Sequence, residues 1–268
     1  MIKDRPGFDL LSEERIKAAL RTELLGNRIY AFWSIGSTNE FAYRRALQGD
    51  REGVLVIAEQ QTKGRGRKSR YWDSPFYKGL WFSLILRPDI QSSQAGLLPY
   101  LAGVSVAEAV ENLLKLTPDL KWPNDLLFQG KKFCGILSEV EFKNGKVKFI
   151  ILGIGINVNQ KLDEFPEQYR NQATSLCQEY NHRIDRAELL AEVLFCLEQN
   201  YKSIGTYGLK EIVSKWKKKC PQYGKEIVII QDDVQIQGQF VDIDDNGCLI
   251  LQTKSGAIKK IVAGDIRF

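Results

Sequence analysis

The chain has 268 residues, of which 44% are hydrophobic and 26% are charged. Since domains average about 150 residues, this length predicts one large domain with a small one attached. The proportions are those of an ordinary globular protein and exclude disordered and fibrous classes. The longest apolar runs, residues 79–86 and 149–158, are shorter than the roughly 18 residues that cross a membrane, so we expect no membrane partner.

The remaining composition narrows the chemistry. Residues 1–6 lead into no apolar stretch of the kind found in secretory signals, which predicts a cytoplasmic protein. Five widely spaced cysteines without a C-x-x-C pair predict neither a disulfide framework nor a zinc site. The single histidine, His182, lies in a polar stretch typical of a surface turn, which argues against catalysis by a Ser-His or Cys-His pair. The net charge of +5 favours acidic or phosphorylated partners without indicating nucleic acid.

In the first third of the chain, apolar spacing predicts a helix over residues 12–25, with Ser12 as its N-cap. A capping box at Ser37-Thr38-Asn39-Glu40 begins a second helix, which Gly49 ends. Continuous β-rich runs predict buried strands over residues 53–59 and 80–86, separated by a glycine- and arginine-rich loop.

The middle of the chain predicts further helices and strands. A long helix covers residues 95–116 and cannot continue through Pro118. Residues 121–125 form a turn between strands. Strands then follow at 126–128, 134–142 and 147–156, the last two joined by a hairpin at 143–146, and a helix covers 185–204.

The composition changes near Pro221, where short strands with polar turns begin. Strands are expected at 227–230, 234–241, 248–253 and 257–262, a spacing typical of a small β-barrel. The basic run 215–219 is interpreted as the solvated face of a helix end. We therefore predict three parts: an N-terminal helix and linker (1–28), an α+β domain with a mixed β-sheet and flanking helices (29–220), and a C-terminal barrel (221–268).

The loop at residues 64–70 carries four cationic side chains in six residues, between and beside glycines. Glycines let the backbone approach a ligand, and the crowded cations repel one another unless an anion lies among them. The loop is neither a P-loop nor a G-x-G-x-x-G motif. Phosphate binding, a solvated basic loop and a nucleic-acid contact all remain open from these residues alone.

Two further segments add to this pattern. Residues 121–125 and 131–137 contribute Lys121, Lys132, the carboxylate of Asp125 and Gly135 at the mouths of strands. Each residue alone is more often structural, but together with the loop they form an anion site that lacks a nucleophile. Gly153 and Gly155 remove side chains from one face of a strand, either so that a ligand lies flat on the sheet or so that a helix packs closely.

The motifs occur together in a recognisable order. They are residues 37–39, residues 61–72 (QTKGRGRKSRYW), residues 121–125 (KWPND), Lys132-x-x-Gly135-Ile136-Leu137 and Gly153-x-Gly155-x-Asn157. This order, from about Ile29 to Phe268, resembles the biotin protein ligase (biotin–[acetyl-CoA-carboxylase] ligase) family in a form that lacks the N-terminal DNA-binding domain. One departure is Lys68-Ser69, where relatives often have Arg-Gly, so the second position loses backbone freedom.

The resemblance implies a catalytic domain like that of class II aminoacyl-tRNA synthetases, followed by an SH3-like barrel. It implies that biotin reacts with ATP to give biotinyl-5′-AMP and pyrophosphate, with Mg²⁺ held mainly by the ATP phosphates. A lysine of a biotin carboxyl carrier domain then takes the biotinyl group. The resemblance also allows a homodimer, and the acceptor carboxylase is left open.

By resemblance, Lys132, Arg67 and Asp125 are the catalytic residues: Lys132 holds the biotin carboxylate and Asp125 orients or deprotonates the incoming lysine. The implied biotin-binding residues are Ser37, Thr38, Asn39, Gln61, Gly64, Arg65, Lys132, Gly135, Gly153 and Gly155. The implied ATP-binding residues are Arg67, Arg70, Trp72, Lys121, Asn124 and Asn157, with Trp72 packing on adenine once the loop closes.

Two alternatives compete with this interpretation. A lipoate or octanoate ligase or transferase shares the architecture but is expected to offer a more apolar tunnel and to lack the Gly-Arg-Gly-Arg loop. A biotin-sensing repressor requires an N-terminal winged helix of roughly 60 residues. Only 36 residues precede Ser37, so we expect no specific DNA partner.

Overall fold

A large mixed β-sheet forms the centre of the molecule, which we describe from a computed structural model covering residues 10–231 and 234–267 in detail. The sheet order is β1-β2-β3-β7-β6-β5-β4, and only β1 and β2 run parallel. The strands are β1 (Ile29–Ile35), β2 (Leu55–Gln61), β3 (Gly79–Leu86), β4 (Asp119–Lys121), β5 (Asp125–Phe128), β6 (Lys131–Lys143) and β7 (Lys146–Asn157). The predicted mixed sheet is confirmed.

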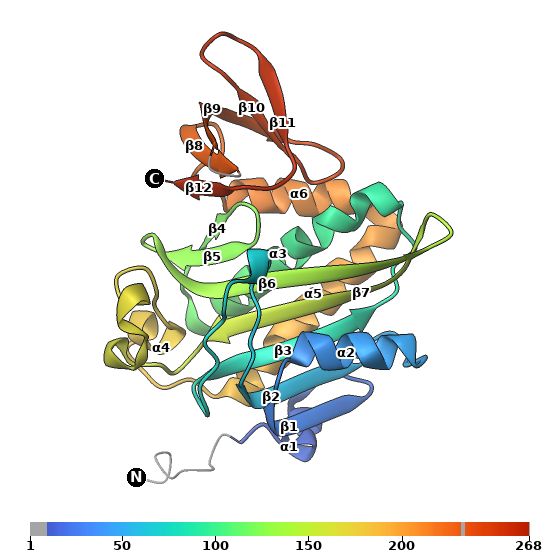
Figure 1. Cartoon of the computed structure of the whole chain (residues 1–268). Coiled ribbons are helices and arrows are strands. Elements are labelled where there is room, and N and C mark those ends of the chain that lie inside the picture. Colours follow the sequence, from blue (N-terminus) through green and yellow to red (C-terminus); the bar gives the residue numbers. More distant parts are fainter. Residues whose placement is uncertain (1–9, 232–233, 268) are drawn as a thin grey trace.

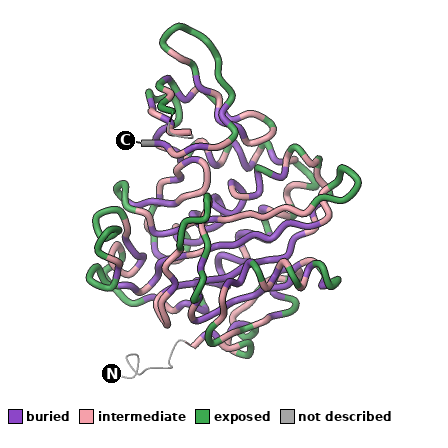
Figure 2. Tube along the Cα trace, in the orientation of Figure 1, coloured by how far each residue is buried: buried purple, intermediate pink, exposed green. Residues whose placement is uncertain are grey.

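Helices cover the two faces of this sheet unequally (Figure 1). On one face lie α3 (Leu98–Leu114), α5 (Arg186–Tyr207) and α6 (Leu209–Lys218), which share the main hydrophobic core with the sheet. The other face carries α2 (Thr38–Leu47), whose alanines Ala42 and Ala46 pack on Phe149 and its neighbours. Figure 2 shows that the buried segments follow the strands while the exposed ones lie at the rim. On the face that carries α2, the end of the sheet that α2 does not cover remains open for a binding site.

The segment Ser92–Leu114, which includes α3, is long and apolar enough to cross a membrane by composition. In the fold, 72% of its most apolar stretch is buried against other elements. Tyr100, Leu101 and Val104 are among its fully buried residues. Packing in the core therefore accounts for its apolar character.

Local capping sets the beginning of two helices as predicted. The Ser37 hydroxyl accepts a hydrogen bond from the Glu40 N–H at the start of α2. Ser12 caps α1 (Glu13–Ala19) in the same way. The prediction that this first helix extends to Leu25 is wrong, because the Glu198 carboxylate accepts three successive backbone N–H groups, from Glu23 to Leu25. This long-range contact replaces the helical hydrogen bonds.

Several elements were not predicted from the sequence. They are β1, β4, α4 (Leu176–Tyr180), α6 and β12 (Asp265–Arg267). The basic run 215–219 belongs to α6 and its C-terminal end, and three of its lysines pair with neighbouring elements. These pairs are Lys215–Glu108, Lys217–Asp242 and Lys219–Glu111. The run lies at a helix end as predicted, but the expectation that its face is simply solvated is wrong, because three of its lysines form ion pairs.

A second, antiparallel sheet forms the C-terminal region, with strand order β11-β10-β9-β8-β12. Its other strands are β8 (Glu226–Gln231), β9 (Val234–Ile243), β10 (Leu249–Gln252) and β11 (Ile258–Ile261), close to the predicted ranges. Phe240 and Leu249 join the main core, and the Tyr100 hydroxyl donates to the Gly247 carbonyl across the junction at 2.7 Å. The predicted boundary at Pro221 lies between α6 and β8. Residues 1–9 of the predicted N-terminal part lie outside the described residues.

Candidate active site

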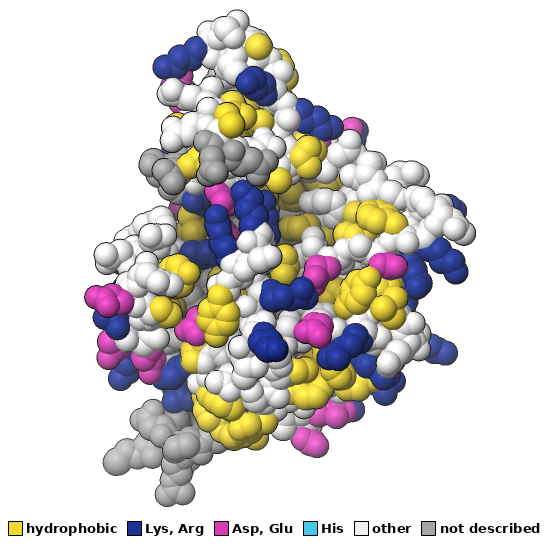
Figure 3. All heavy atoms as spheres, viewed as in Figure 1, with side chains coloured by type: hydrophobic (Ala, Val, Ile, Leu, Met, Phe, Trp, Pro, Cys, Tyr) yellow, Lys and Arg dark blue, Asp and Glu magenta, His cyan; other side chains and the backbone are white. Residues whose placement is uncertain are grey.

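A cavity of about 1050 Å³ opens where β5, β6 and β7 meet β12 and the loop at residues 64–70, which we call the basic loop. This volume is at the upper end of the range typical of small-molecule sites, which is about 300–1,000 Å³. Figure 3 shows Lys and Arg side chains gathered in a hollow between the C-terminal sheet and the large domain. All predicted site residues line this cavity except Gly64. Gly64 closes the base of the loop, where its carbonyl accepts from the Trp72 N–H and a Cβ would lie 2.2 Å from the Trp72 carbonyl oxygen.

Arg67 is held at one side of the cavity by Asn124. The Arg67 guanidinium donates to Asn124 Oδ1 at 3.0 Å, and Asn124 Nδ2 donates to the Ile136 carbonyl at 2.6 Å. Burial lowers the pKa of Arg67, and burial likewise lowers the pKa of Lys121 on the same side. Both cations are thus incompletely solvated, so an incoming anion would find them at little further desolvation cost.

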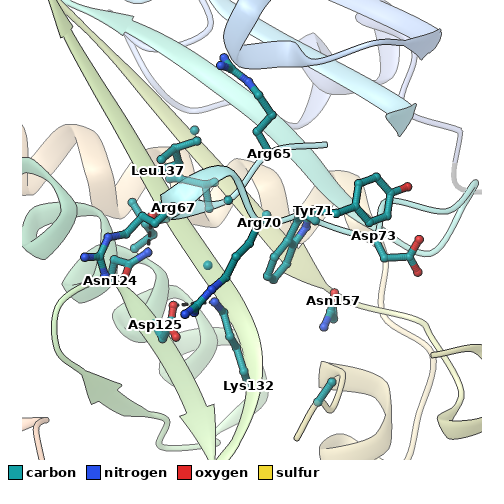
Figure 4. A pocket seen from close by; sticks show the side chains of 18 of the residues that line it. Arg65, Arg67, Arg70, Tyr71, Asp73, Asn124, Asp125, Lys132, Leu137 and Asn157 are labelled. Carbon is teal, nitrogen blue, oxygen red and sulfur yellow. Dashed lines mark hydrogen bonds and ion pairs between the residues drawn. The ribbon is translucent and has the colours of Figure 1, made fainter. Parts of the chain in front are cut away.

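Lys132 and Asp125 face each other across β5 and β6. Lys132 Nζ lies 2.6 Å from Asp125 Oδ1 and 5.1 Å from the centre of the Trp72 ring. Figure 4 shows Lys132 and Asp125 converging with Arg70, while Arg67 lies beside Asn124. Asp125 therefore balances the charge of Lys132, and its predicted contact with an acceptor lysine stays a prediction.

The tip of the basic loop is tied to the C-terminal sheet. The Asp265 carboxylate on β12 accepts from Arg70 at 2.6 Å and lies 3.7 Å from Lys68 Nζ. Lys68 and Ser69 have φ values of 53° and 57°, in the left-handed region that costs a non-glycine residue about 1 kcal/mol or more. The departure from Arg-Gly at this point is therefore accommodated with strain.

Trp72 lies on the two glycines that face each other across β6 and β7. Gly135 is paired with Gly155, and a Cβ on Gly155 would lie 2.5 Å from Trp72 Nε1. A Cβ on Gly153 would instead lie 2.0 Å from Asn39 Oδ1 on α2. One glycine thus provides a flat surface and the other allows a helix to pack closely. The predicted contact of Trp72 with adenine stays a prediction, since its ring here is next to the glycines implied in biotin binding.

Polar side chains form the floor of the opposite side of the cavity. Gln61 Oε1 accepts the Thr38 backbone N–H at 2.9 Å, and Gln61 Nε2 donates to Ser74 Oγ at 3.1 Å. Ser83 contacts both Thr38 and Asn39. Ser74 and Ser83 were not predicted. A serine inside the apolar run 80–86 was the signal that could have revealed Ser83.

Asn157 lies at the end of β7. Its side chain donates to the Thr174 carbonyl at 3.1 Å and accepts from Gln160 Nε2 at 3.1 Å. Phe165 and Tyr169 line the cavity beside it. The predicted ATP-binding residue is thus held rigidly at one end of the cavity. Neither Glu139, which contacts Arg65, nor Asp265 was predicted, and no local pattern marks either residue.

Comparisons with known proteins agree on one family. Residues 32–157 match the model of the Biotin/lipoate A/B protein ligase family, and residues 223–268 match the Biotin protein ligase C terminal domain. The chain is 41% identical to the Bifunctional ligase/repressor BirA of Bacillus spizizenii, over 96% of this chain and 78% of that protein. It is 33% identical to a Biotin--[acetyl-CoA-carboxylase] ligase of Mycobacterium tuberculosis, over 92% of this chain and 93% of that one.

The fold comparison leads to the same family. The structure of the biotin protein ligase from Aquifex aeolicus in complex with biotin and ATP superposes with a TM-score of 0.77 and 34% identity. The match covers 90% of this chain and 98% of the other. Sequence motifs, cavity and fold therefore agree, and the chain belongs to the biotin protein ligase family.

Proposed function

We propose that the cavity binds biotin and ATP together, joins them to biotinyl-5′-AMP with release of pyrophosphate, and then passes the biotinyl group to a lysine of a carrier domain. One observation carries this proposal. A single cavity places the cations Arg67, Arg70, Lys121 and Lys132 beside a flat surface at Gly135 and Gly155. This arrangement suits a carboxylate substrate and a polyphosphate lying next to each other.

In the first step, a biotin carboxylate oxygen forms a bond to the α-phosphorus of ATP while the bond from that phosphorus to pyrophosphate breaks. Both reactants are anions, so the barrier is largely electrostatic. Lys132 would neutralise the carboxylate, and Arg67 and Lys121 would neutralise the phosphates. Because the carboxylate of biotin is itself the nucleophile, the protein needs only to position and neutralise the reactants.

Magnesium is expected to arrive with the nucleotide. Within residues 10–231 and 234–267, no group of three or more His, Cys, Asp or Glu side chains is placed to hold a metal ion. Three carboxylates line the cavity, those of Asp73, Asp125 and Asp265, and the last two are engaged by Lys132 and Arg70. We therefore derive no step through protein-bound Mg²⁺.

In the second step, a lysine amine attacks the carbonyl carbon of the mixed anhydride and AMP leaves. The attacking amine must be neutral, although a free lysine has a pKa of about 10.4. Asp125 is suited to orient that amine and to receive its proton, because binding of the biotin carboxylate to Lys132 would release Asp125 from its ion pair. The acceptor we propose is the biotin carboxyl carrier domain of a carboxylase.

Biotin is favoured over lipoate by the floor of the cavity. The ureido ring needs paired hydrogen bonds, and Thr38 and Gln61 line the cavity as buried polar side chains. A dithiolane ring has no polar N–H or carbonyl group to pair with them. The match of residues 223–268 to a biotin protein ligase domain supports the same choice.

We also propose the finer classification. The large domain would be of the class II synthetase-like type, and the five-stranded sheet would be an SH3-like barrel. A cytoplasmic location agrees with five free cysteines. Homodimer formation and the absence of a specific DNA partner stay predictions.

The test is direct. The protein is incubated with biotin, ATP and Mg²⁺, and mass spectrometry is used to detect biotinyl-5′-AMP; an isolated carrier domain is then added and its mass is measured. Lipoate in place of biotin is the control. Formation of lipoyl-AMP in preference to biotinyl-AMP, or of neither product, would overturn the proposal.

A further inference from the structure

Glu139 on β6 joins two parts of the site that are distant in the sequence. Its Oε2 atom accepts a hydrogen bond from Asn39 Nδ2 of α2 at 2.8 Å and from the Arg65 guanidinium of the basic loop at 3.1 Å. Figure 4 shows Arg65 pointing away from the cluster formed by Arg67, Arg70 and Lys132. Arg65 is thus the cation of the loop that Glu139 withdraws from the phosphate side.

The side chain of Asn39 is committed to the protein on every side. Its Nδ2 atom donates to Glu139 and, at 3.4 Å, to the Leu137 carbonyl, while Oδ1 accepts from Ser83 Oγ at 2.6 Å. A carboxylate can only accept hydrogen bonds, so Glu139 forces the amide to direct its nitrogen toward β6 and its oxygen toward Ser83. Asn39 is therefore one member of a chain of hydrogen-bonded side chains, Glu139, Asn39, Ser83 and Thr38, which we call the relay. The resemblance instead implied that Asn39 contacts biotin directly.

The hydrogen bonds along the relay determine the role of Thr38. Ser83 Oγ donates to Asn39 Oδ1 at 2.6 Å and is also the donor in its 2.8 Å contact with Thr38 Oγ1. Thr38 Oγ1 in turn donates to Gln61 Oε1 at 3.0 Å, and that oxygen, which has two lone pairs, also accepts the Thr38 backbone N–H at 2.9 Å. Because its one hydrogen is used by Gln61, Thr38 Oγ1 lines the cavity as an acceptor.

We propose that Glu139 is a positioning residue for the ligase reaction: through Asn39 and Ser83 it holds the Thr38 hydroxyl in place as an acceptor for a ureido N–H of biotin. Arg65 holds the Glu139 carboxylate in place. The inference rests on the proposed biotin site. It adds to that site a chain of four side chains through which Glu139 acts without contacting biotin.

The chain offers a matched control on the same strand. Glu141 lies two residues further along β6 and also binds α2, where it accepts from the Tyr43 hydroxyl at 2.5 Å. This hydrogen bond from Tyr43 to Glu141 involves neither Arg65 nor Asn39. Glu139→Gln and Glu141→Gln therefore make the same chemical change on the same face, and only the first disturbs the relay.

The measurement is pyrophosphate release with biotin and ATP varied separately, together with the thermal unfolding midpoint. We expect Glu139→Gln to raise the KM for biotin about tenfold or more and to leave the KM for ATP within about twofold, since one misdirected hydrogen bond is worth about 1–2 kcal/mol. Glu141→Gln should leave both constants within twofold. Equal changes in both constants, or equal behaviour of the two variants, would overturn the inference.

A double-mutant cycle separates a relay from a merely structural effect. In Thr38→Val the acceptor is absent, so Glu139→Gln in that background should raise the KM for biotin by less than about twofold. Additive effects would refute coupling through Thr38. If Glu139→Gln does not fold, Ser83→Ala interrupts the same relay with a smaller change and must produce the same selective rise. A wild-type protein that forms no biotinyl-AMP would instead refute the proposed function.

Discussion

Arg70 of the basic loop and Asp265 of β12 form an ion pair of 2.6 Å, although 195 positions separate them in the sequence. Burial tends to raise the pKa of Asp265, but the hydrogen bond and charge of Arg70 outweigh it, so that pKa is lowered. The pair connects the loop over the cavity with the last strand of the C-terminal sheet. The two sheets thereby share one site as well as one hydrophobic core.

Replacing Asp265 should release the loop. In Asp265→Asn the charge that attracts Arg70 and Lys68 is lost, and a partly exposed pair of this kind contributes about 1 kcal/mol. We expect trypsin to cleave after Arg65, Arg67 or Arg70 about fivefold faster than in the wild type without ligands, and biotin with ATP to suppress cleavage in both proteins. Cleavage rates that do not change with the substitution would contradict this role.

Gly155→Ala should impair biotin binding selectively. The added methyl group would lie 2.5 Å from Trp72 Nε1, so the indole must leave the flat surface. We expect a rise of about tenfold in the KM for biotin, measured by pyrophosphate release, because a displaced ring no longer shapes the pocket. The control is Gly205→Ala on α5, where a Cβ meets no atom within 4 Å. An unchanged KM in Gly155→Ala would disprove the importance of the flat surface.

Lys132→Ala and Arg67→Ala should each lower the rate of adenylate formation about 100-fold or more while leaving the fold intact. Both cations act on charge that develops during transfer, and loss of one preorganised group of this kind typically costs that much. Single-turnover formation of biotinyl-AMP is the measurement. Lys131→Ala, which removes an exposed neighbour on β6, should have little effect. A wild-type rate in either active-site variant would reject the assignment.

Glu59→Gln should destabilise the protein strongly. Glu59 and Arg186 form a 2.7 Å ion pair with side-chain exposures of 2% and 0%, and the Leu11 N–H also donates to Glu59. Neutralising one member of a buried ion pair typically costs about 3–5 kcal/mol. Urea denaturation followed by circular dichroism measures this loss. The exposed pair Glu23–Lys202 provides the control, since Glu23→Gln should change stability by less than about 1 kcal/mol.

Asp50 should contribute to the acid sensitivity of the fold. Hydrogen bonds from Arg45, and secondarily from Tyr30, lower its pKa below the ordinary 3.8 even though burial opposes the shift. A carboxyl group whose pKa is lowered by folding stabilises the protein above the unfolded value, and this contribution is lost as the pH falls through the folded value. Urea unfolding measured between about pH 6 and about pH 2.5 should therefore show a smaller pH dependence in Asp50→Asn. An identical dependence in both proteins would exclude Asp50 as a contributor.

Patterns confined to a few residues were sufficient for part of this fold. The capping box at Ser37 predicts the start of α2, and Asn144-Gly145 predicts the β6–β7 hairpin, where both residues have positive φ. These signals act over three or four residues and need no tertiary partner. The order of the basic, KWPND and glycine motifs similarly pointed to the family before any contact was known.

Other features depend on partners that lie far apart in the chain. The first helix ends at Ala19 because Glu198 captures the following N–H groups, and no signal near Ala19 records that carboxylate. The end of β12 brings Asp265 to Arg70 only after the C-terminal sheet has docked on the main core. Contacts of this kind are absent from any local pattern.

The same distinction holds within the site. The sequence by itself indicated most of the cations, glycines and polar residues that line the cavity, because each belongs to a short contiguous motif, whereas Asp265 belongs to none. Only the tertiary structure decided how they are oriented: Trp72 lies on Gly155, and Asn39 turns toward Glu139. Orientation depends on which donors and acceptors meet across strands and helices, and hydrogen bonds constrain direction only between groups that folding has already brought within about 3 Å.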